Sequence, residues 1–232
     1  AGDRFPIIGM CMGHEWMMTF ASGMERDELI EWGFDAEDYN IPLEFTDFGL
    51  EKSYTFGGRT KLQEVLQKKI PYNHHKRGLK PETFLATPGI TDMFEITSTS
   101  VGNNGTAFVS SMEARDFETY PFWSFQWHPE KCPYEYAVLE GTDQFRQDTV
   151  HTDESTRMAF ELAQQFVEEA KKSNHAYTRF KKYPIIWNYP IARTSYFQQI
   201  FLTDDAHPNA GQSKSLRGNK SVAHVESETT IA

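Results

Sequence analysis

The stretch FPIIGMCMGHEW, residues Phe5–Trp16, sets a cysteine between two glycines close to the start of the 232-residue chain. Before the cysteine, Phe5–Ile8 is an apolar run with β-branched members, which favours a strand. After it, His14–Ala21 favours a helix, and Gly23 is of the residue type that commonly ends one. The predicted order is therefore strand, Gly-x-Cys-x-Gly, helix.

This order matches a nucleophile elbow. In such an elbow a sharp turn between strand and helix lifts the nucleophile out of the sheet, and glycines on either side avoid side-chain clashes. Cys11 would stand at the N-terminus of the helix, where unpaired backbone N–H groups and the helix dipole favour the reactive thiolate. The alternative is a buried cysteine in a tight junction, and a base elsewhere in the chain would decide between the two.

The segment FQWHPEK, residues Phe125–Lys131, supplies such a base. A strand predicted over Pro121–Trp127 delivers His128, the next proline ends it, and Glu130 follows closely enough for its carboxylate to meet the imidazole. A lone histidine at a strand end is usually a surface or packing residue. Together with Cys11, however, it predicts thiolate attack on a carbonyl. His128 would act as acid and base, and Glu130 would fix its tautomer.

The composition limits what the chain can be and what it can bind. With 39% hydrophobic side chains, 232 residues can build the core of one large globular domain. A net charge of −10 argues against a nucleic acid partner, because phosphate binding needs clustered Lys and Arg. No apolar run approaches the roughly 20 residues that cross a bilayer, so we expect no membrane partner. Two cysteines, Cys11 and Cys132, do not suffice for a disulfide framework.

Periodicity and turn signals predict further elements. They are a short helix over residues 27–33, a strand over 43–48, a helix over 60–69, strands over 94–101 and 106–112 joined by a hairpin turn at 102–105, and a long helix over about 153–173. The apolar stripe of the long helix, with Met158 and Leu162, is assigned to the core. Beyond Asp204 apolar residues are sparse, which predicts a flexible tail.

The motifs GMCMGHE (residues 9–15) and WHPEK (127–131) together resemble the class I glutamine amidotransferase superfamily. Further segments narrow the resemblance to the gamma-glutamyl hydrolases. They are IPLEFT (41–46), NHHKRGL (73–79), FQWHPEKCPYEY (125–136), FVEEAKKSNH (166–175) and SYFQQIFLTD (195–204), and they occur in the family's order. The resemblance extends from Phe5 to Asp204.

The resemblance implies an α/β fold, namely a three-layer sandwich with a mainly parallel central sheet, glutamine amidotransferase-like and lacking its N-terminal strands. It implies an N-terminally incomplete hydrolase domain over residues 1–204, followed by a flexible C-terminal tail over 205–232. It implies a triad of Cys11, His128 and Glu130 that hydrolyses gamma-glutamyl bonds in poly-gamma-glutamylated folates without a cofactor. The location would be the lysosome, the vacuole or the extracellular space, and the family suggests a homodimer.

Three more residues are candidates for binding the substrate. The backbone N–H of Met12 would meet the oxyanion. Glu15 stands where glutamine-using relatives carry Gln, and its carboxylate could meet a free amino group of the substrate or lie on the helix surface. His75 matches a histidine that the family places by the active site, although His74 and His75, as a pair on a loop, would ordinarily face solvent. No metal is assigned, because further ligands at suitable spacing are missing.

Two rival functions and one structural expectation stay open. The elbow and the His-Pro-Glu motif are shared with glutaminase subunits of amidotransferases, and a non-catalytic paralogue could keep the fold.

Sequons at Asn104 and Asn219 are compatible with an exported protein. The resemblance implies that further strands and a loop with a second oxyanion donor precede the nucleophile, so its place at residue 11 leads us to expect a longer natural chain. These residues alone would expose a sheet edge and an apolar face.

Overall fold

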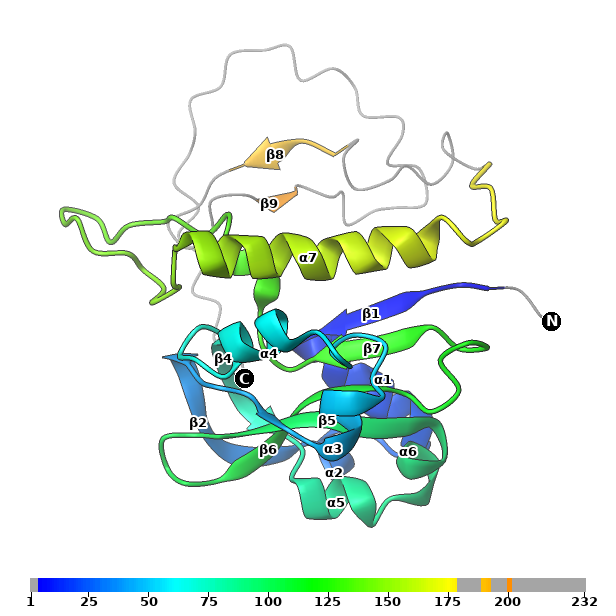
Figure 1. Cartoon of the computed structure of the whole chain (residues 1–232). Coiled ribbons are helices and arrows are strands. Elements are labelled where there is room, and N and C mark those ends of the chain that lie inside the picture. The colour runs from blue at the N-terminus through cyan, green and yellow to red at the C-terminus, as the bar shows by residue number, and fades with distance from the viewer. Residues whose placement is uncertain (1–3, 179–188, 193–199, 202–232) are drawn as a thin grey trace. The chain divides into compact units, whose positions relative to one another are not determined.

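A five-stranded mixed sheet forms the centre of the fold (Figure 1). In spatial order its strands are β1 (Ile7–Met10), β7 (Phe122–Phe125), β6 (Ala107–Ala114), β5 (Phe94–Val101) and β3 (Glu44–Phe45). The computed structural model describes residues 4–178, 189–192 and 200–201. Their sheets and helices confirm the α/β class.

The predicted mainly parallel sheet is wrong for the residues that the structure describes. Only β1 and β7 run parallel there, and the neighbours in the rest of the sheet pair antiparallel. The reason lies in the connections. The strands β5, β6 and β7 follow one another through short turns, which suit antiparallel pairs, whereas β1 reaches β7 only through a long crossover.

A second sheet of two antiparallel strands pairs β2 (Glu31–Asn40) with β4 (Tyr72–Gly78). The sequence did not predict either strand. The helix expected over 27–33 is only α2 (Arg26–Leu29), because Ile30 turns extended and β2 begins. The register of the pair is interrupted twice, which weakens the alternation that would have marked β2 as a strand.

The chain divides into two compact units, and the first includes the described residues 4–176. Its remaining elements are helices. They are α1 (Met12–Ser22), α3 (Asp47–Glu51), α4 (Thr60–Leu66), α5 (Pro81–Leu85), α6 (Pro88–Met93), the 3₁₀-helix η1 (Pro129–Lys131) and α7 (Asp153–Ala170). The strand expected over 43–48 is only two residues long, because the Thr46 side chain caps α3 by accepting the Gly49 N–H. The hairpin turn at 102–105 is confirmed, and Gly105 has a φ of 80° there.

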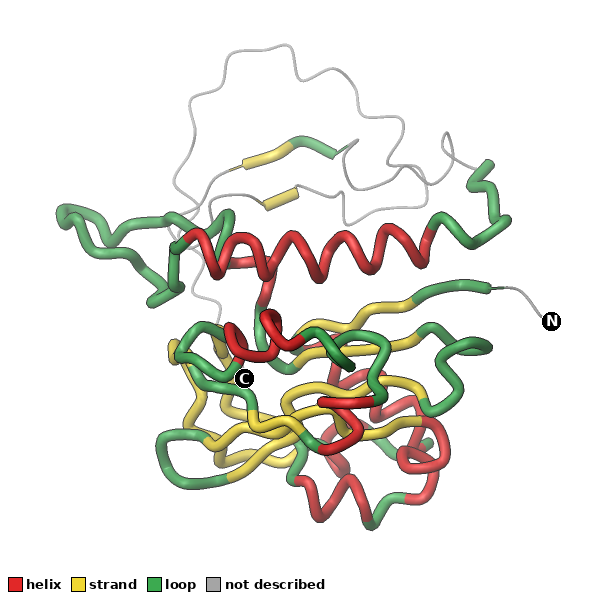
Figure 2. The backbone as a smooth tube through the Cα atoms, viewed as in Figure 1, coloured by secondary structure: helices red, strands yellow, loops and turns green. Residues whose placement is uncertain are grey.

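Helices cover both faces of the five-stranded sheet (Figure 2). One core cluster joins Met18 of α1 and Phe84 of α5 to the sheet residue Val109. The other joins Leu62 of α4 and Met158 of α7 to the opposite sheet face. The predicted role of the α7 stripe in the core is confirmed, since Met158 and Leu162 are each 2% exposed.

The described residues contain a sheet edge, as expected, and an exposed apolar stripe that lies on helix α1 and not on the sheet. The strand β1 is an edge strand there. Along α1, Met12, Trp16 and Phe20 are spaced four residues apart and are 57%, 40% and 77% exposed. The rings of Trp16 and Phe20 stack on each other at 5.4 Å. The helix therefore turns an apolar stripe away from the core cluster that its residue Met18 joins.

The second compact unit contains the described strands β8 (Ile191–Ala192) and β9 (Ile200–Phe201), which pair antiparallel. The predicted tail over 205–232 lies outside the described residues. The domain predicted over 1–204 is not tested by them and stays a prediction.

Candidate active site

Cys11 occupies a strained turn between β1 and α1. It is the residue that precedes the helix, and its φ of 49° and ψ of −107° are unfavourable for any residue with a Cβ atom. Its backbone N–H donates to the carbonyl oxygen of Phe125 at 2.8 Å, so the turn is tied to the end of β7. This is the predicted order of strand, cysteine and helix.

The two glycines beside the cysteine have different roles. A Cβ atom on Gly9 would lie 2.7 Å from the backbone carbonyl of Gly13 and from the Met17 sulfur, so only glycine fits there. A Cβ atom on Gly13 would meet nothing within 4 Å. The predicted clash is therefore confirmed for Gly9 and wrong for Gly13.

His128 follows β7 and lies beside the cysteine. Its backbone N–H donates to the Tyr72 carbonyl at 2.8 Å, and its Nδ1 is 2.7 Å from Oε1 of Glu130 in η1. Burial disfavours the charged imidazolium, but side-chain hydrogen bonds with Cys11 and Glu130 outweigh it and raise the pKa of His128 to about 9. The structure thus brings Cys11, His128 and Glu130 together, as expected. Their catalytic roles stay predictions.

Met12 begins α1, and its side chain is largely exposed. The first backbone N–H groups of a helix have no partner within the helix, so the N–H of Met12 is suited to receive an anion next to the Cys11 sulfur. Its role as an oxyanion donor stays a prediction.

Glu15 lies one turn into α1 and is only 3% exposed, so the alternative of a helix-surface glutamate is wrong. Its carboxylate accepts from Nε of Arg26 in α2 at 3.0 Å and forms an ion pair with that guanidinium. The sequence analysis missed this partner, because Arg26 is eleven residues away on another helix. A contact between Glu15 and the substrate's amino group stays a prediction.

The histidine pair was expected on a loop, but it lies on β4. His74 is exposed, but His75 is 7% exposed and packs edge-on against Phe108 at 4.8 Å. Burial lowers the pKa of His75 to about 4, with a further contribution from the charge of His128. The expected solvent-facing pair is therefore wrong for His75, because neighbouring side chains on a strand point to opposite faces. Its role in substrate binding stays a prediction.

Two residues that the sequence analysis did not single out border the site. Tyr72 is fully buried, its ring lies 6.3 Å from that of His128, and its hydroxyl donates to Oδ1 of Asp38 at 2.7 Å. Nζ of Lys131 lies 5.3 Å from the centre of the Tyr72 ring. Burial lowers the pKa of Lys131, while Glu130 and the Cys11 sulfur favour its charge. The place of Lys131 in the WHPEK motif was a signal for it.

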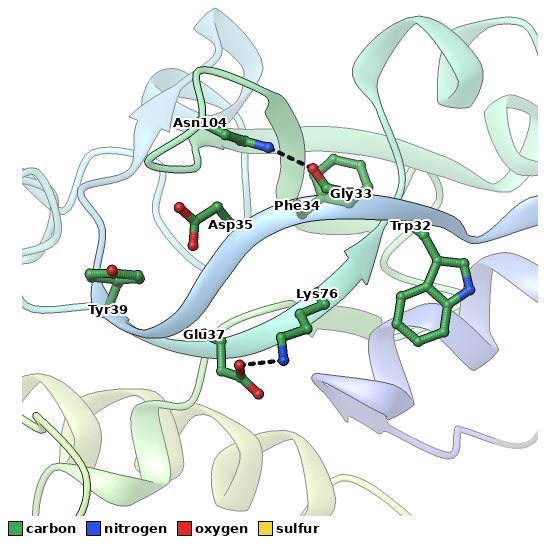
Figure 3. A pocket seen from close by; sticks show the side chains of 8 residues that line it. All are labelled: Trp32, Gly33, Phe34, Asp35, Glu37, Tyr39, Lys76 and Asn104. Carbon is green, nitrogen blue, oxygen red and sulfur yellow. Dashed lines mark hydrogen bonds and ion pairs between the residues drawn. The ribbon is translucent and has the colours of Figure 1, made fainter. Parts of the chain in front are cut away.

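A shallow depression of about 510 Å³ lies on the β2·β4 pair (Figure 3). It is lined by Trp32, Gly33, Phe34, Asp35, Glu37, Tyr39, Lys76 and Asn104. The Glu37 carboxylate pairs with Lys76 at 2.6 Å, and the side chain of Asn104 donates to the Gly33 carbonyl at 2.7 Å. None of the predicted site residues lines it, so this depression is separate from the candidate site.

Within 4–178, 189–192 and 200–201, no three His, Cys, Asp or Glu side chains are grouped so that they could hold a metal ion. In those ranges, no helix combines the length and the apolar character needed to cross a bilayer.

A thiol at a strained strand-helix turn, beside a histidine that is bonded to a carboxylate, is typical of hydrolases with a cysteine nucleophile.

No protein-family model matches the chain. Curated proteins do match it. The chain is 32% identical over 209 residues to gamma-glutamyl hydrolase of Homo sapiens, which is 88% of this chain and 61% of that protein. It is 29% identical over 216 residues to gamma-glutamyl hydrolase B of Dictyostelium discoideum, which is 90% of this chain and 58% of that protein.

A plant relative agrees with these two. Gamma-glutamyl hydrolase 1 of Arabidopsis thaliana is 32% identical over 177 residues, 75% of this chain and 46% of that protein. The resemblance predicted from the motifs is confirmed, and the chain is a homologue of the gamma-glutamyl hydrolases. It spans about three fifths of the length of the human and Dictyostelium relatives.

Proposed function

We propose that this chain hydrolyses gamma-glutamyl bonds, with poly-gamma-glutamylated folates as its small-molecule substrates. The observation that carries the proposal is that the His128 side chain hydrogen-bonds both Cys11 and the Glu130 carboxylate, whose Oε1 lies 2.7 Å from Nδ1. The activity for which these homologues are named supports the choice of bond. The helices on both faces of the sheet support a three-layer sandwich of the glutamine amidotransferase-like class.

The geometry suits a two-step mechanism. The Cys11 thiolate attacks the gamma-carbonyl carbon, and the Met12 N–H donates to the oxygen that becomes negative. The His128 imidazolium gives its proton to the leaving amine, and a thioester forms on Cys11. His128 then takes a proton from water, which hydrolyses the thioester and releases the product acid. Glu130 holds the ring in the tautomer that both steps need.

The decisive experiment offers the protein a gamma-linked folate polyglutamate and, separately, free glutamine. We expect glutamate to be released from the folate, no ammonia from glutamine, and neither product with Cys11→Ala. Ammonia from glutamine would instead identify a glutaminase subunit. If a cooperatively folded protein releases neither product, the chain is a non-catalytic paralogue and the proposal is overturned.

The family resemblance also carries three secondary proposals. The protein would act in a lysosome, a vacuole or outside the cell, would form a homodimer, and would need no cofactor. Analytical ultracentrifugation of the protein tests the dimer, and activity after exhaustive dialysis against a chelator tests the cofactor.

A further inference from the structure

We propose that Gln126 is a positioning residue for the Cys11 sulfur, which its side-chain amide N–H holds and stabilises as the thiolate. The proposal rests on the proposed function only in taking Cys11 as the nucleophile. The sequence analysis assigned Gln126 no role, although it lies two residues before the predicted base.

The geometry follows from the contacts made directly after β7, where the backbone bends at Gln126 and Trp127. The rings of Phe125 and Trp127 lie 5.0 Å apart in the core cluster that contains Met158. Nε2 of Gln126 lies 4.0 Å from the Cys11 sulfur, and the side chain of His128 also hydrogen-bonds Cys11.

Burial of the amide argues against a purely structural role. Gln126 is 0% exposed, and its Oε1 has no hydrogen-bond partner among the described residues. Burying an unpaired carbonyl oxygen destabilises the fold, and an apolar side chain of the same length would avoid that cost. The feature that an apolar side chain lacks is the N–H directed at the sulfur. A thiolate has no proton to donate, so the amide must face it with its nitrogen.

The amide differs from the other groups that act on the sulfur. His128 and Lys131 carry charges that favour the thiolate and that depend on pH. The Glu15 carboxylate, on the helix that follows Cys11, is neutralised by Arg26. The N–H of Gln126 does not titrate, so it favours the thiolate at every pH. Its loss therefore weakens the stabilisation of the thiolate without removing the contribution of His128.

The test measures the rate at which iodoacetamide alkylates Cys11 as a function of pH, with peptide mass spectrometry to separate it from Cys132. Gln126→Met keeps the side-chain length and removes the donor. We expect the midpoint of the Cys11 profile to move to higher pH, and the rate below that midpoint to fall about tenfold, the typical worth of one hydrogen bond. An unchanged midpoint in a folded Gln126→Met protein overturns the proposal.

The chain offers a matched control. Gln165 is also buried, donates from Nε2 to the Thr55 carbonyl, and has an Oε1 without a partner among the described residues. Gln165→Met makes the same chemical change away from Cys11, and we expect it to leave the alkylation profile in place. If both variants shift the profile equally, the effect is a general loosening of the core and the proposal fails.

A second measurement does not depend on the folding of a Gln126 variant. In ¹⁵N-labelled wild-type protein, the side-chain amide resonance of Gln126 should move as Cys11 titrates, and this movement should vanish in Cys11→Ala. A resonance that is indifferent to Cys11 overturns the proposal. Neither measurement uses a substrate, so a failure to hydrolyse folate polyglutamates would not be mistaken for a failure of this contact.

Discussion

His128 and Glu130 meet across the turn that begins η1, with Nδ1 and Oε1 2.7 Å apart. In the charged ring Nδ1 carries a proton, which the carboxylate accepts. Because the pKa of His128 is raised from 6.5 to about 9, the charged ring stabilises the fold fully below pH 6.5. This stabilisation is lost as the pH rises through about 9.

The first prediction concerns Glu130→Gln. An amide still holds the ring but stabilises imidazolium poorly, so we expect turnover to fall by up to about 10⁴-fold, the loss known for the equivalent change in a serine protease triad. The alkaline limb of the pH–rate profile should move to lower pH, because the pKa of His128 falls. Steady-state kinetics with a folate polyglutamate measure both effects. A loss as complete as that of Cys11→Ala would mean that Glu130 does more than orient the ring.

The second prediction compares two substitutions at the elbow. Cys11→Ala and Cys11→Gly both remove the nucleophile, so both should abolish hydrolysis. They should differ in stability, because the backbone at φ 49° strains alanine but not glycine. We expect Cys11→Gly to be more stable than Cys11→Ala by about 1 kcal/mol in urea unfolding. Equal stabilities would show that the turn stores no strain, and substantial turnover by either folded variant would contradict the proposed nucleophile.

The third prediction uses the two glycines as a pair. In Gly9→Ala the new methyl group would lie 2.7 Å from the Gly13 backbone, so we expect a loss of about 1–3 kcal/mol in the free energy of unfolding. In Gly13→Ala nothing lies within 4 Å, and alanine favours the helix by about 0.5–1 kcal/mol. Thermal melts of both variants against wild type check the opposite signs.

The fourth prediction concerns Glu169, a fully buried carboxylate on α7. Burial opposes its charge, but hydrogen bonds with Lys172, Tyr54 and Arg4 outweigh burial and lower its pKa below 4.5. A carboxylate with a lowered pKa stabilises the fold above its unfolded pKa, and the effect is lost as the pH falls through the folded pKa. We expect Glu169→Gln to destabilise the protein by about 1–3 kcal/mol at neutral pH.

The neighbouring residue provides the control for this prediction. Glu168 pairs with Lys171 in the same i,i+3 geometry, but both side chains are at least half exposed. Glu168→Gln should therefore change the free energy of unfolding by less than about 1 kcal/mol. Urea unfolding should also show the gap between wild type and Glu169→Gln closing below about pH 4.5. A gap that persists in acid would mean that lost packing, and not lost charge, destabilises the variant.

The sequence predicted the features that depend on local chemistry. The elbow at Cys11 was visible because a strand signal, two glycines and a helix signal follow one another within a few residues. The hairpin turn at 102–105 and the long helix α7 were visible for the same reason. His128 and Glu130 are neighbours in the chain, so their pairing needed no knowledge of the fold.

The features that were missed depend on residues far apart in the chain. Nothing in the sequence around Glu15 reveals that Arg26 folds back onto its carboxylate. The burial of His75 follows from the pairing of β4 with β2, whose irregular register hides its alternation. The direction of the strands also depends on how they are connected. The family resemblance predicted a mainly parallel sheet, but the short turns between β5, β6 and β7 make these strands antiparallel.

The parallel pairing of β1 with β7 determines when during folding the site can form. Cys11 and Gln126 are 115 residues apart, and no hairpin can bring their strands together. Contacts between such distant segments form slowly, because a long loop must close before they stabilise anything. During synthesis the thiol leaves the ribosome well before its base is made. Formation of the site therefore depends on the docking of β7, and a nascent or refolding chain passes through a stage in which the thiol is present without its neighbouring histidine.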